Sequence, residues 1–246
     1  MRGPAAIYVQ RSIDTTTDAE TWAPMEGFVQ LHQGFPPVAE TASMDVVSVT
    51  EGADTFTCNA YLVLGDQVTL VDAGAMEGVV DSIREYTDHI DAVVITHQHA
   101  DHVAELGAVI ESFDPPVYGY AEHPHRTHGI DDGDELRIGD EGFEVVYTPG
   151  HAPDHVALVS DTALFSGDVV VYNDAAFDDG SFGRTDRTGQ SRERLIQSLE
   201  TLLDRLPPTV ERLYAGHGDV FEGDVHAVIE RALDRAQRRE PKYPDE

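Results

Sequence analysis

Short apolar runs separated by glycine-containing turns dominate the chain after residue 44, and each run predicts a β-strand. The predicted strands are residues 46–49, 58–64, 68–71, 93–95, 117–120, 135–138, 143–147, 156–159, 163–165 and 212–215. Apolar residues at helical spacing predict helices as well. The predicted helices are residues 76–87, 103–110, 195–206 and 225–236. Two strand-rich halves, each followed by helices, indicate a layered α/β protein.

Residues 1–43 carry no clear apolar period, and Gly, Pro, Thr and Ala dominate much of this segment. We therefore expect an N-terminal extension that is loosely ordered or packed on a domain covering residues 44–246. The length of 246 residues fits one sizeable domain, with a core large enough to need no disulfide or metal staple.

The chain is strongly acidic, with a formal net charge of −30 from 46 acidic and 16 basic residues. Lys242 is the only lysine, yet 41% of the residues are hydrophobic, so the acidity belongs to a protein with a core rather than to a disordered tail. Concentrated salt screens the self-repulsion of such a chain. The composition predicts a halophilic protein. It also argues against nucleic acid as a partner, because phosphates are bound by clusters of Lys and Arg.

Cys58 is the only cysteine, which excludes an internal disulfide, and its setting in a predicted strand indicates a packed position in the core. No apolar run is long enough to span a membrane, and the N-terminus has no signal-peptide core. We therefore expect a cytoplasmic protein without a membrane partner. The sequence leaves the oligomeric state open.

Candidate chemistry begins directly after the predicted strand 93–95, in the segment Thr96-His97-Gln98-His99-Ala100-Asp101-His102. Three imidazoles and one carboxylate fall within six residues, and all four are good ligands for zinc or a similar metal. A loop that leaves a strand can turn these side chains toward one point, whereas a regular strand or helix would not gather all of them. The segment therefore predicts a metal site.

The segment His97-Gln98-His99-Ala100-Asp101-His102 resembles the HxHxDH signature of the metallo-β-lactamase fold hydrolases. Further candidates follow in the order that this family shows: His151 in Thr-Pro-Gly-His, Asp168 in Ser-Gly-Asp and His217 in Ala-Gly-His-Gly. Together these motifs cover most of residues 45–220. The resemblance implies an αββα sandwich, with residues 44–246 as the catalytic domain.

The resemblance also implies a centre for two divalent metal ions, with zinc expected and iron or manganese as alternatives. The resemblance implies that one ion is held by His97, His99 and His151. It implies that the second ion is held by Asp101, His102 and His217, and that Asp168 bridges the two ions. Such ions lower the pKa of bound water to about 7 and so supply hydroxide, with Asp101 and Asp168 as the catalytic carboxylates. This chemistry suits hydrolysis of an ester, thioester, lactam or phosphodiester in a small-molecule substrate.

Other polar residues near these motifs have supporting or structural interpretations. His155 lies four residues after His151, and we expect it to support the ligand loop rather than to bind metal. The resemblance places the acidic turn that begins at Asp72 beneath the metal loop. A further histidine cluster lies outside the signature, and we interpret it as a solvated helix start: His123, His125 and His128.

The segment Gly183-Arg184-Thr185-Asp186 resembles the GRTD element of glyoxalase II-like and persulfide dioxygenase-like members of the family. Arg184 would then hold a substrate carboxylate through a two-point contact, or it would pair with Asp186 and shape the loop. Tyr172 would line the substrate pocket or serve in packing. Glyoxalase II enzymes add a helical C-terminal domain that grips the thiol carrier, whereas the residues after His217 suffice for one helix.

These observations predict a metal-dependent hydrolase, and a glyoxalase II-like thioesterase is the first hypothesis. The second hypothesis is a mononuclear iron persulfide dioxygenase, which uses two histidines and one aspartate, here His97, His151 and Asp168. A lactonase and a non-catalytic metal-binding module are further alternatives. Metal content, together with activity on thioesters, lactones and persulfides, distinguishes these hypotheses.

Overall fold

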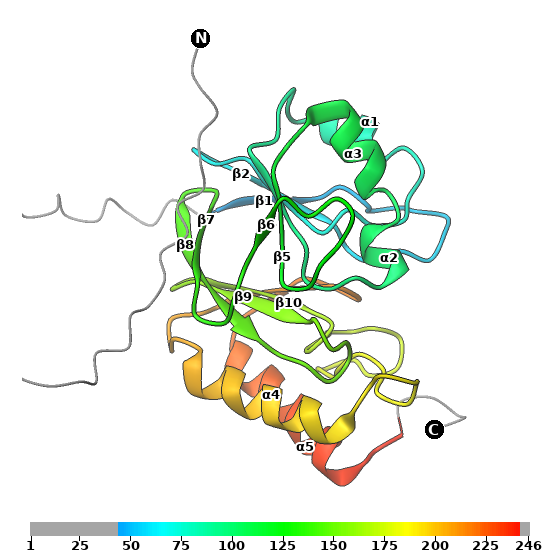
Figure 1. The fold of residues 1–246 in the computed structure, drawn as a ribbon. Coiled ribbons are helices and arrows are strands. Elements are labelled where there is room, and N and C mark those ends of the chain that lie inside the picture. The colour runs from blue at the N-terminus through cyan, green and yellow to red at the C-terminus, as the bar shows by residue number, and fades with distance from the viewer. Residues whose placement is uncertain (1–43, 242–246) are drawn as a thin grey trace, which may run out of the picture.

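The computed structural model describes residues 44–241, and two six-stranded sheets form the centre of the molecule. Helices cover the outer face of each sheet, so the layers follow in the order helix, sheet, sheet, helix (Figure 1). This is the αββα sandwich that the sequence predicts. The expected N-terminal extension, residues 1–43, lies outside the described residues.

The first sheet contains the strands of the N-terminal half in chain order: β1 (Asp45–Ser48), β2 (Tyr61–Leu64), β3 (Thr69–Val71), β4 (Ala92–Val94), β5 (Val117–Gly119) and β6 (His128–Gly129). The pairs from β1 to β3 are antiparallel, and the pairs from β3 to β6 are parallel. Successive strand residues point to opposite faces. Leu62 and Leu70 therefore pack among the outer helices, whereas Tyr61 and Val63 pack against the second sheet.

The second sheet contains the later strands in the order β12 (Phe221–Glu222), β11 (Arg212–Ala215), β10 (Ala163–Gly167), β9 (Val156–Val159), β8 (Glu141–Tyr147) and β7 (Glu135–Ile138). The outer face of this sheet is covered by two helices, α4 (Arg192–Arg205) and α5 (Val225–Arg238). Each helix begins at a side-chain cap: Ser191 accepts from the Arg194 N–H, and Asp224 accepts from the Ala227 N–H.

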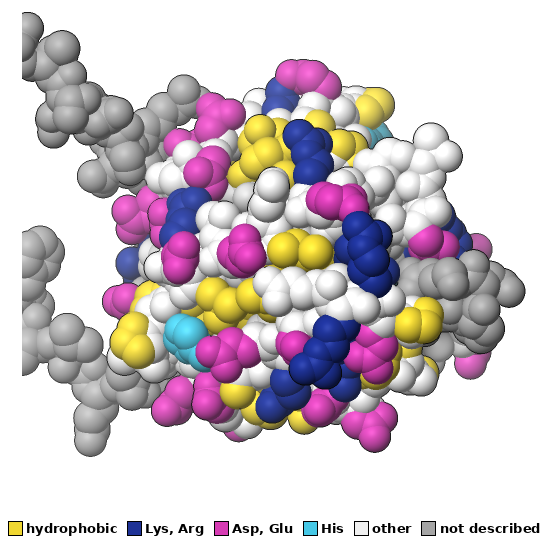
Figure 2. Space-filling view, turned by 90° about the horizontal axis from the view of Figure 1, so that it is seen from below, with side chains coloured by type: hydrophobic (Ala, Val, Ile, Leu, Met, Phe, Trp, Pro, Cys, Tyr) yellow, Lys and Arg dark blue, Asp and Glu magenta, His cyan; other side chains and the backbone are white. Residues whose placement is uncertain are grey.

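The face of the molecule that carries α4 and α5 mixes acidic and arginine side chains (Figure 2). Arg235 lies 2.8 Å from Asp179, and Arg238 lies 2.9 Å from Asp234. Pairs that are open to solvent on at least one side contribute little stability each. They neutralise single acidic side chains on this face.

The helix expected at residues 76–87 is shorter in the structure, where α1 covers Val79–Arg84. It begins after Gly78, whose φ of 91° is left-handed and cannot belong to the helix. The strand expected at 58–64 likewise begins only at Tyr61. Cys58 is fully buried, as predicted.

The single helix expected at residues 103–110 is divided in the structure into two helices: α2 (Ala100–Val103) and α3 (Leu106–Phe113). The Glu105 N–H donates to the carbonyl of Gly74 instead of continuing α2. The carbonyl of Asp101, which a continued helix would use, accepts from the Cys58 N–H. Contacts with distant parts of the chain therefore end α2 just after the metal loop.

The helix start expected around His123 and His125 is wrong, because that segment forms turns and bends. His128 belongs to β6, whose position is set by a bond from the Thr127 N–H to the carbonyl of Val117. The longest described helices, α4 and α5, have 14 residues each, and no helix within residues 44–241 is long and apolar enough to cross a lipid bilayer.

Candidate metal centre

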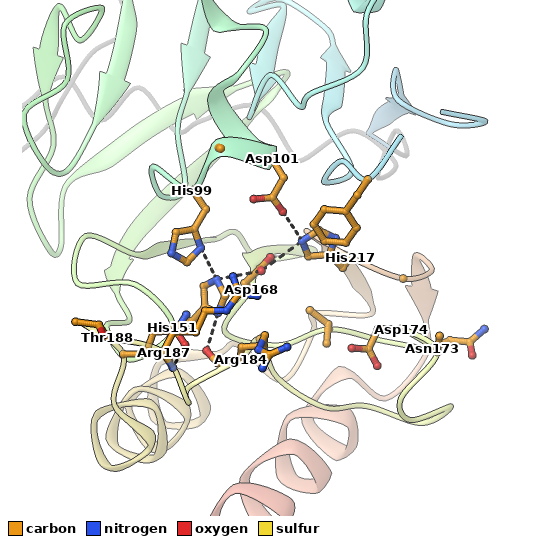
Figure 3. Close-up of a pocket in the computed structure, with 17 residues that line it drawn as sticks. His99, Asp101, His151, Asp168, Asn173, Asp174, Arg184, Arg187, Thr188 and His217 are labelled. Carbon is orange, nitrogen blue, oxygen red and sulfur yellow. Dashed lines mark hydrogen bonds and ion pairs between the residues drawn. The ribbon is translucent and has the colours of Figure 1, made fainter. Parts of the chain in front are cut away.

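The predicted ligands meet at one edge of the sandwich, where strands of both sheets end. The candidates follow these elements: His97 and His99 after β4, Asp101 and His102 in α2, His151 after β8, Asp168 after β10, and His217 after β11. Figure 3 shows side chains from both sheets pointing toward one another across this edge. Residues far apart in the sequence thus form one cluster.

The first group of donors consists of three histidines. The Nδ1 atom of His99 lies 3.0 Å from Nε2 of His97 and 2.8 Å from Nε2 of His151. In tetrahedral zinc sites with Zn–N of about 2.0–2.1 Å, the ligand atoms lie roughly 3.3–3.4 Å apart. The three nitrogens therefore need only small shifts to share one ion.

The second group of donors combines a carboxylate with two imidazoles. The ligand atoms of Asp101, His102 and His217 all lie within 4.8 Å of one another. Within this group, Oδ2 of Asp101 lies 3.1 Å from Nε2 of His217. Mixed His and carboxylate donors suit zinc, iron or manganese.

Asp168 lies between the two groups and contacts both. Its Oδ2 atom is 3.2 Å from Nε2 of His151 and 3.5 Å from Nε2 of His217. Its Oδ1 atom is 3.4 Å from Nε2 of His102. Oδ2 of Asp168 thus lies near a nitrogen of each group, which is the arrangement that a bridging ligand requires.

Two buried atoms of the centre support the fit of metal ions. Oδ1 of Asp168 and Nε2 of His102 are inaccessible to solvent and have no hydrogen-bond partner among residues 44–241. Buried polar atoms are nearly always satisfied by a hydrogen bond or by an ion. The donor set and these atoms therefore fit divalent metal ions.

Three of the donors, His97, His151 and Asp168, have the charge state that metal binding needs. Burial lowers the pKa of His97 well below its usual range and lowers that of His151 to about 4. Burial alone would raise the pKa of Asp168, but the neighbouring imidazoles, led by His217, hold it well below its usual range. Two neutral imidazoles and one ionised carboxylate can thus bind an ion near neutral pH.

Asp72 anchors the metal loop from behind. Its Oδ1 accepts from the Thr96 N–H at 2.8 Å, and its Oδ2 accepts from the Thr96 hydroxyl at 2.7 Å. The same Oδ2 accepts from Nδ1 of His102 at 2.8 Å. Because Nδ1 donates to Asp72, Nε2 is the nitrogen of His102 that faces Asp168 and is left to bind an ion. The acidic turn does lie beneath the metal loop, as the resemblance implied.

His155 supports the centre without being a donor to it. The Asp168 N–H donates to Nε2 of His155 at 2.9 Å, and Nδ1 of His155 contacts the Thr148 hydroxyl at 2.8 Å. A backbone N–H can only donate, so Nε2 is unprotonated and Nδ1 donates. Both ring nitrogens are occupied, which confirms the predicted supporting role.

Two glycines allow the chain to pass close to the donors. A β-carbon at Gly183 would lie 2.4 Å from Nδ1 of His151, and one at Gly216 would lie 2.4 Å from Oδ1 of Asp168. Neither distance is compatible with a side chain. Glycine at both positions therefore leaves the space that the side chains of His151 and Asp168 occupy.

A cavity of about 610 Å³ opens beside the donors (Figure 3). Phe56 lines it and stacks on His217 with ring centroids 5.2 Å apart, although 79% of Phe56 is exposed. Arg184 also lines it, and its guanidinium binds both carboxylate oxygens of Asp186 at 2.8 and 2.5 Å. Tyr172 packs against Phe221 instead, while its neighbours in sequence line the cavity.

Several residues at the site have no clear signal in the sequence. Phe56, Arg187 and Gln190 line the cavity but lie in irregular segments without a motif. Asn59 fastens the loop of His217 by donating to the carbonyls on either side of it, at 3.0 and 2.9 Å.

The family described as the Metallo-beta-lactamase superfamily matches residues 53–217, which is more than half of the chain. The chain therefore belongs to the metallo-beta-lactamase superfamily, as its HxHxDH segment and its fold indicate.

Individual proteins are similar to this chain in sequence or in structure. A hydroxyacylglutathione hydrolase of Vibrio cholerae is 33% identical over 151 residues, which are 60% of this chain and 56% of that protein. The chain thus spans about half the length of this curated relative. The crystal structure of TTHA1623 in a di-iron-bound form is 28% identical with a TM-score of 0.56, covering 71% of this chain and 93% of that one. ETHE1 from Myxococcus xanthus shares the fold, with a TM-score of 0.61 at 23% identity over 82% of this chain and 93% of that one.

Proposed function

We propose that this protein is a metal-dependent hydrolase of small-molecule thioesters, of the glyoxalase II type. The observation that carries the proposal is the position of Asp168 between two groups of donors, with its oxygens 3.2 to 3.5 Å from nitrogens of His151, His102 and His217. A shared carboxylate is what two adjacent cations need. The 33% identity to a hydroxyacylglutathione hydrolase supports thioesters as the substrate class.

The proposed ligands are those of the two groups described above, with Asp168 shared between them. Zinc is the proposed metal, with iron and manganese as alternatives, and a relative that is 28% identical has been solved in a di-iron-bound form. When bound, such ions lower the pKa of water to about 7 and so supply a hydroxide nucleophile and a Lewis acid.

The residues of the chain prepare the site for this chemistry. The proton on Nδ1 of His151 is donated to the carbonyl of Arg184 at 2.9 Å, which leaves Nε2 free to face the centre. Asp72 likewise accepts from Nδ1 of His102, so that Nε2 of His102 faces the centre. Both His97 and Asp168 are buried, so bulk water is excluded from the inner side of the centre.

The substrate would enter from the open side, where Asp101 lines the cavity. Burial would raise the pKa of Asp101, but its hydrogen bond with His217 holds the pKa below the usual value, so this carboxylate is ionised. We assign Asp101 and Asp168 as the catalytic carboxylates, which accept hydrogen bonds from the nucleophile and orient it toward the thioester carbonyl. Arg184 shapes the loop beneath the cavity through its contact with Asp186.

A mononuclear iron persulfide dioxygenase is the second candidate, because His151 and Asp168 lie 3.2 Å apart with His97 beside His151. These three residues would form a two-His-one-carboxylate iron site. Against this candidate, Nδ1 of His99 lies within 3.0 Å of both histidine nitrogens of that set. In an iron site without His99 as a ligand, this imidazole would crowd the ion.

The test is to purify the protein in molar salt, to count its metal ions and to assay thioesters, lactones and persulfides. We expect about two ions per chain and thioester hydrolysis, with both sharply reduced in His99→Ala and His217→Ala. His125→Ala is the matched control, because His125 is exposed and lies outside the centre. Stoichiometric iron retained in His99→Ala, with oxygen consumed on a persulfide, would replace the hydrolase by the dioxygenase.

We further propose residues 44–246 as the catalytic domain and the cytoplasm as the place of action, with neither nucleic acid nor membrane as a partner. The domain assignment is supported by both sheets and all the donors lying within residues 44–241. The net charge of −30 argues against nucleic acid as a partner. It equally supports a salt-rich surrounding for the protein.

A further inference from the structure

The cavity beside the metal centre has one cationic side. Arg184 and Arg187 both line it. Figure 3 places Arg187 next to Thr188, on the side of His99 and His151 and away from His217. Acidic residues outnumber basic ones by 46 to 16 in the whole chain, whereas at this cavity two arginines stand beside three aspartates, Asp101, Asp168 and Asp174.

The two arginines differ in what they bind within the protein. The Arg184 guanidinium donates from Nε and Nη2 to the two oxygens of Asp186. Arg187 has no ion pair and no side-chain hydrogen bond within residues 44–241, and its side chain is exposed at the cavity. The pKa of Asp186 is lowered mainly by its hydrogen bonds with Arg184, and the charge of Arg187 adds to this effect. The carboxylate oxygens of Asp186 nevertheless bind Arg184 and not Arg187. Arg187 therefore keeps its donors for another anion.

The backbone holds Arg187 beside the metal centre. The Gln190 N–H donates to the carbonyl of Arg187 at 3.0 Å, and the Gln190 side chain accepts from the Arg187 N–H at 2.9 Å. Gly189 supplies the φ of 89° that a tight turn of this kind requires at its third residue. The Ser191 N–H then donates at 2.8 Å to the carbonyl of Gly150, the residue before His151. The base of the Arg187 side chain is thus tied to the ligand loop.

We propose that Arg187 is a specificity-determining residue that binds a carboxylate of the substrate at the end of the cavity away from His217. The inference rests on the proposed thioesterase function and adds the charge of the substrate to it. A guanidinium presents a planar fork of donors that matches a carboxylate. The carboxylate belongs either to the acyl part or to the thiol part of the thioester, and the two sources are separated experimentally.

Three small thioesters test the proposal: neutral S-acetylmercaptoethanol, S-succinylmercaptoethanol with its carboxylate on the acyl part, and S-acetyl-3-mercaptopropionate with its carboxylate on the thiol part. The measured quantity is the ratio of kcat/KM for each anionic thioester to kcat/KM for the neutral one. Because the ratio is taken within one preparation, it does not depend on metal loading or on the folded fraction.

In Arg187→Gln we expect this ratio to fall about tenfold for one of the two anionic thioesters, mainly through KM, which corresponds to about 1.4 kcal/mol. Arg137→Gln is the matched control, because Arg137 is an exposed arginine of β7 outside the cavity, and its loss changes the net charge equally. Molar salt shortens the Debye length to about 3 Å, so long-range effects of charge are suppressed while a direct contact persists.

Equal ratios in wild type and Arg187→Gln, or equal falls in both variants, would overturn the role of Arg187 and leave the thioesterase function standing. If the wild type hydrolyses no thioester, the proposed function fails, and the anion site at Arg187 is then tested by binding measurements. Calorimetry with 3-(methylthio)propionate and with neutral 3-(methylthio)propan-1-ol should then show tighter binding of the anion, by about tenfold, and Arg187→Gln should remove the preference. Binding of both probes with equal affinity by the wild type would refute the anion site.

Discussion

Replacing Gly183 by alanine should disable the metal centre although it removes no ligand. The new β-carbon would lie 2.4 Å from Nδ1 of His151, 2.8 Å from the carbonyl oxygen of Asp168 and 2.9 Å from its β-carbon. The backbone at this point cannot easily retreat, because the Gly183 N–H donates to that carbonyl oxygen at 2.7 Å. His151 or Asp168 must therefore move, and both are proposed ligands.

The expected effect on stability is moderate and the effect on activity is large. Overpacking a buried site costs about 1–3 kcal/mol. For a domain of this size, each kcal/mol lowers Tm by roughly 2–4 °C, so a fall of about 2–12 °C follows. A displacement of catalytic groups by about 1 Å can cost about 100-fold in rate. We expect Gly183→Ala to lose metal and about 100-fold in kcat/KM while it remains folded.

The assay compares this variant with Gly107→Ala by calorimetry, metal analysis and thioester hydrolysis in molar salt. Gly107 lies in α3, and the nearest atom to an added β-carbon is Nε2 of His125 at 3.8 Å, an ordinary contact. Alanine is favoured over glycine inside a helix by about 0.5–1 kcal/mol, so Tm should rise slightly with metal content unchanged. Wild-type metal content and activity in Gly183→Ala would refute the argument from close approach.

Three further outcomes follow from the structure. Asp72→Asn should lower metal affinity about 10- to 100-fold, because an amide nitrogen facing Nδ1 of His102 would move the proton to Nε2; titration calorimetry measures this, and unchanged affinity would contradict the role of Asp72. Tm should rise between 0.01 M and 1 M salt, because the net charge of −30 is then screened, and a flat or falling Tm would speak against a halophilic protein. A chain that starts at Met44 should fold and bind as much metal as the full chain, which metal analysis checks; a soluble product without metal would show that residues 1–43 belong to the site.

The sequence by itself determined the layered fold and the place of the chemistry. Apolar runs bounded by turns located most strands, because alternation and turn residues are local properties. The ligand types after the strand at 93–95, with His151, Asp168 and His217 following in family order, indicated the superfamily that the match to residues 53–217 shows. The sequence also predicted the buried position of Cys58, from its setting in a predicted strand.

Tertiary structure decided how these parts meet, because each outcome depends on contacts between distant segments. Bonds from Cys58 to Asp101 and from Glu105 to Gly74 divide a helix that its own apolar period predicts as continuous. The packing of two sheets sets Asp168 between donors from both halves, a position that no local pattern encodes. The position of Arg187 likewise depends on a contact between distant segments. Its turn is hydrogen-bonded to the loop of His151, and this bond places the Arg187 side chain at the cavity.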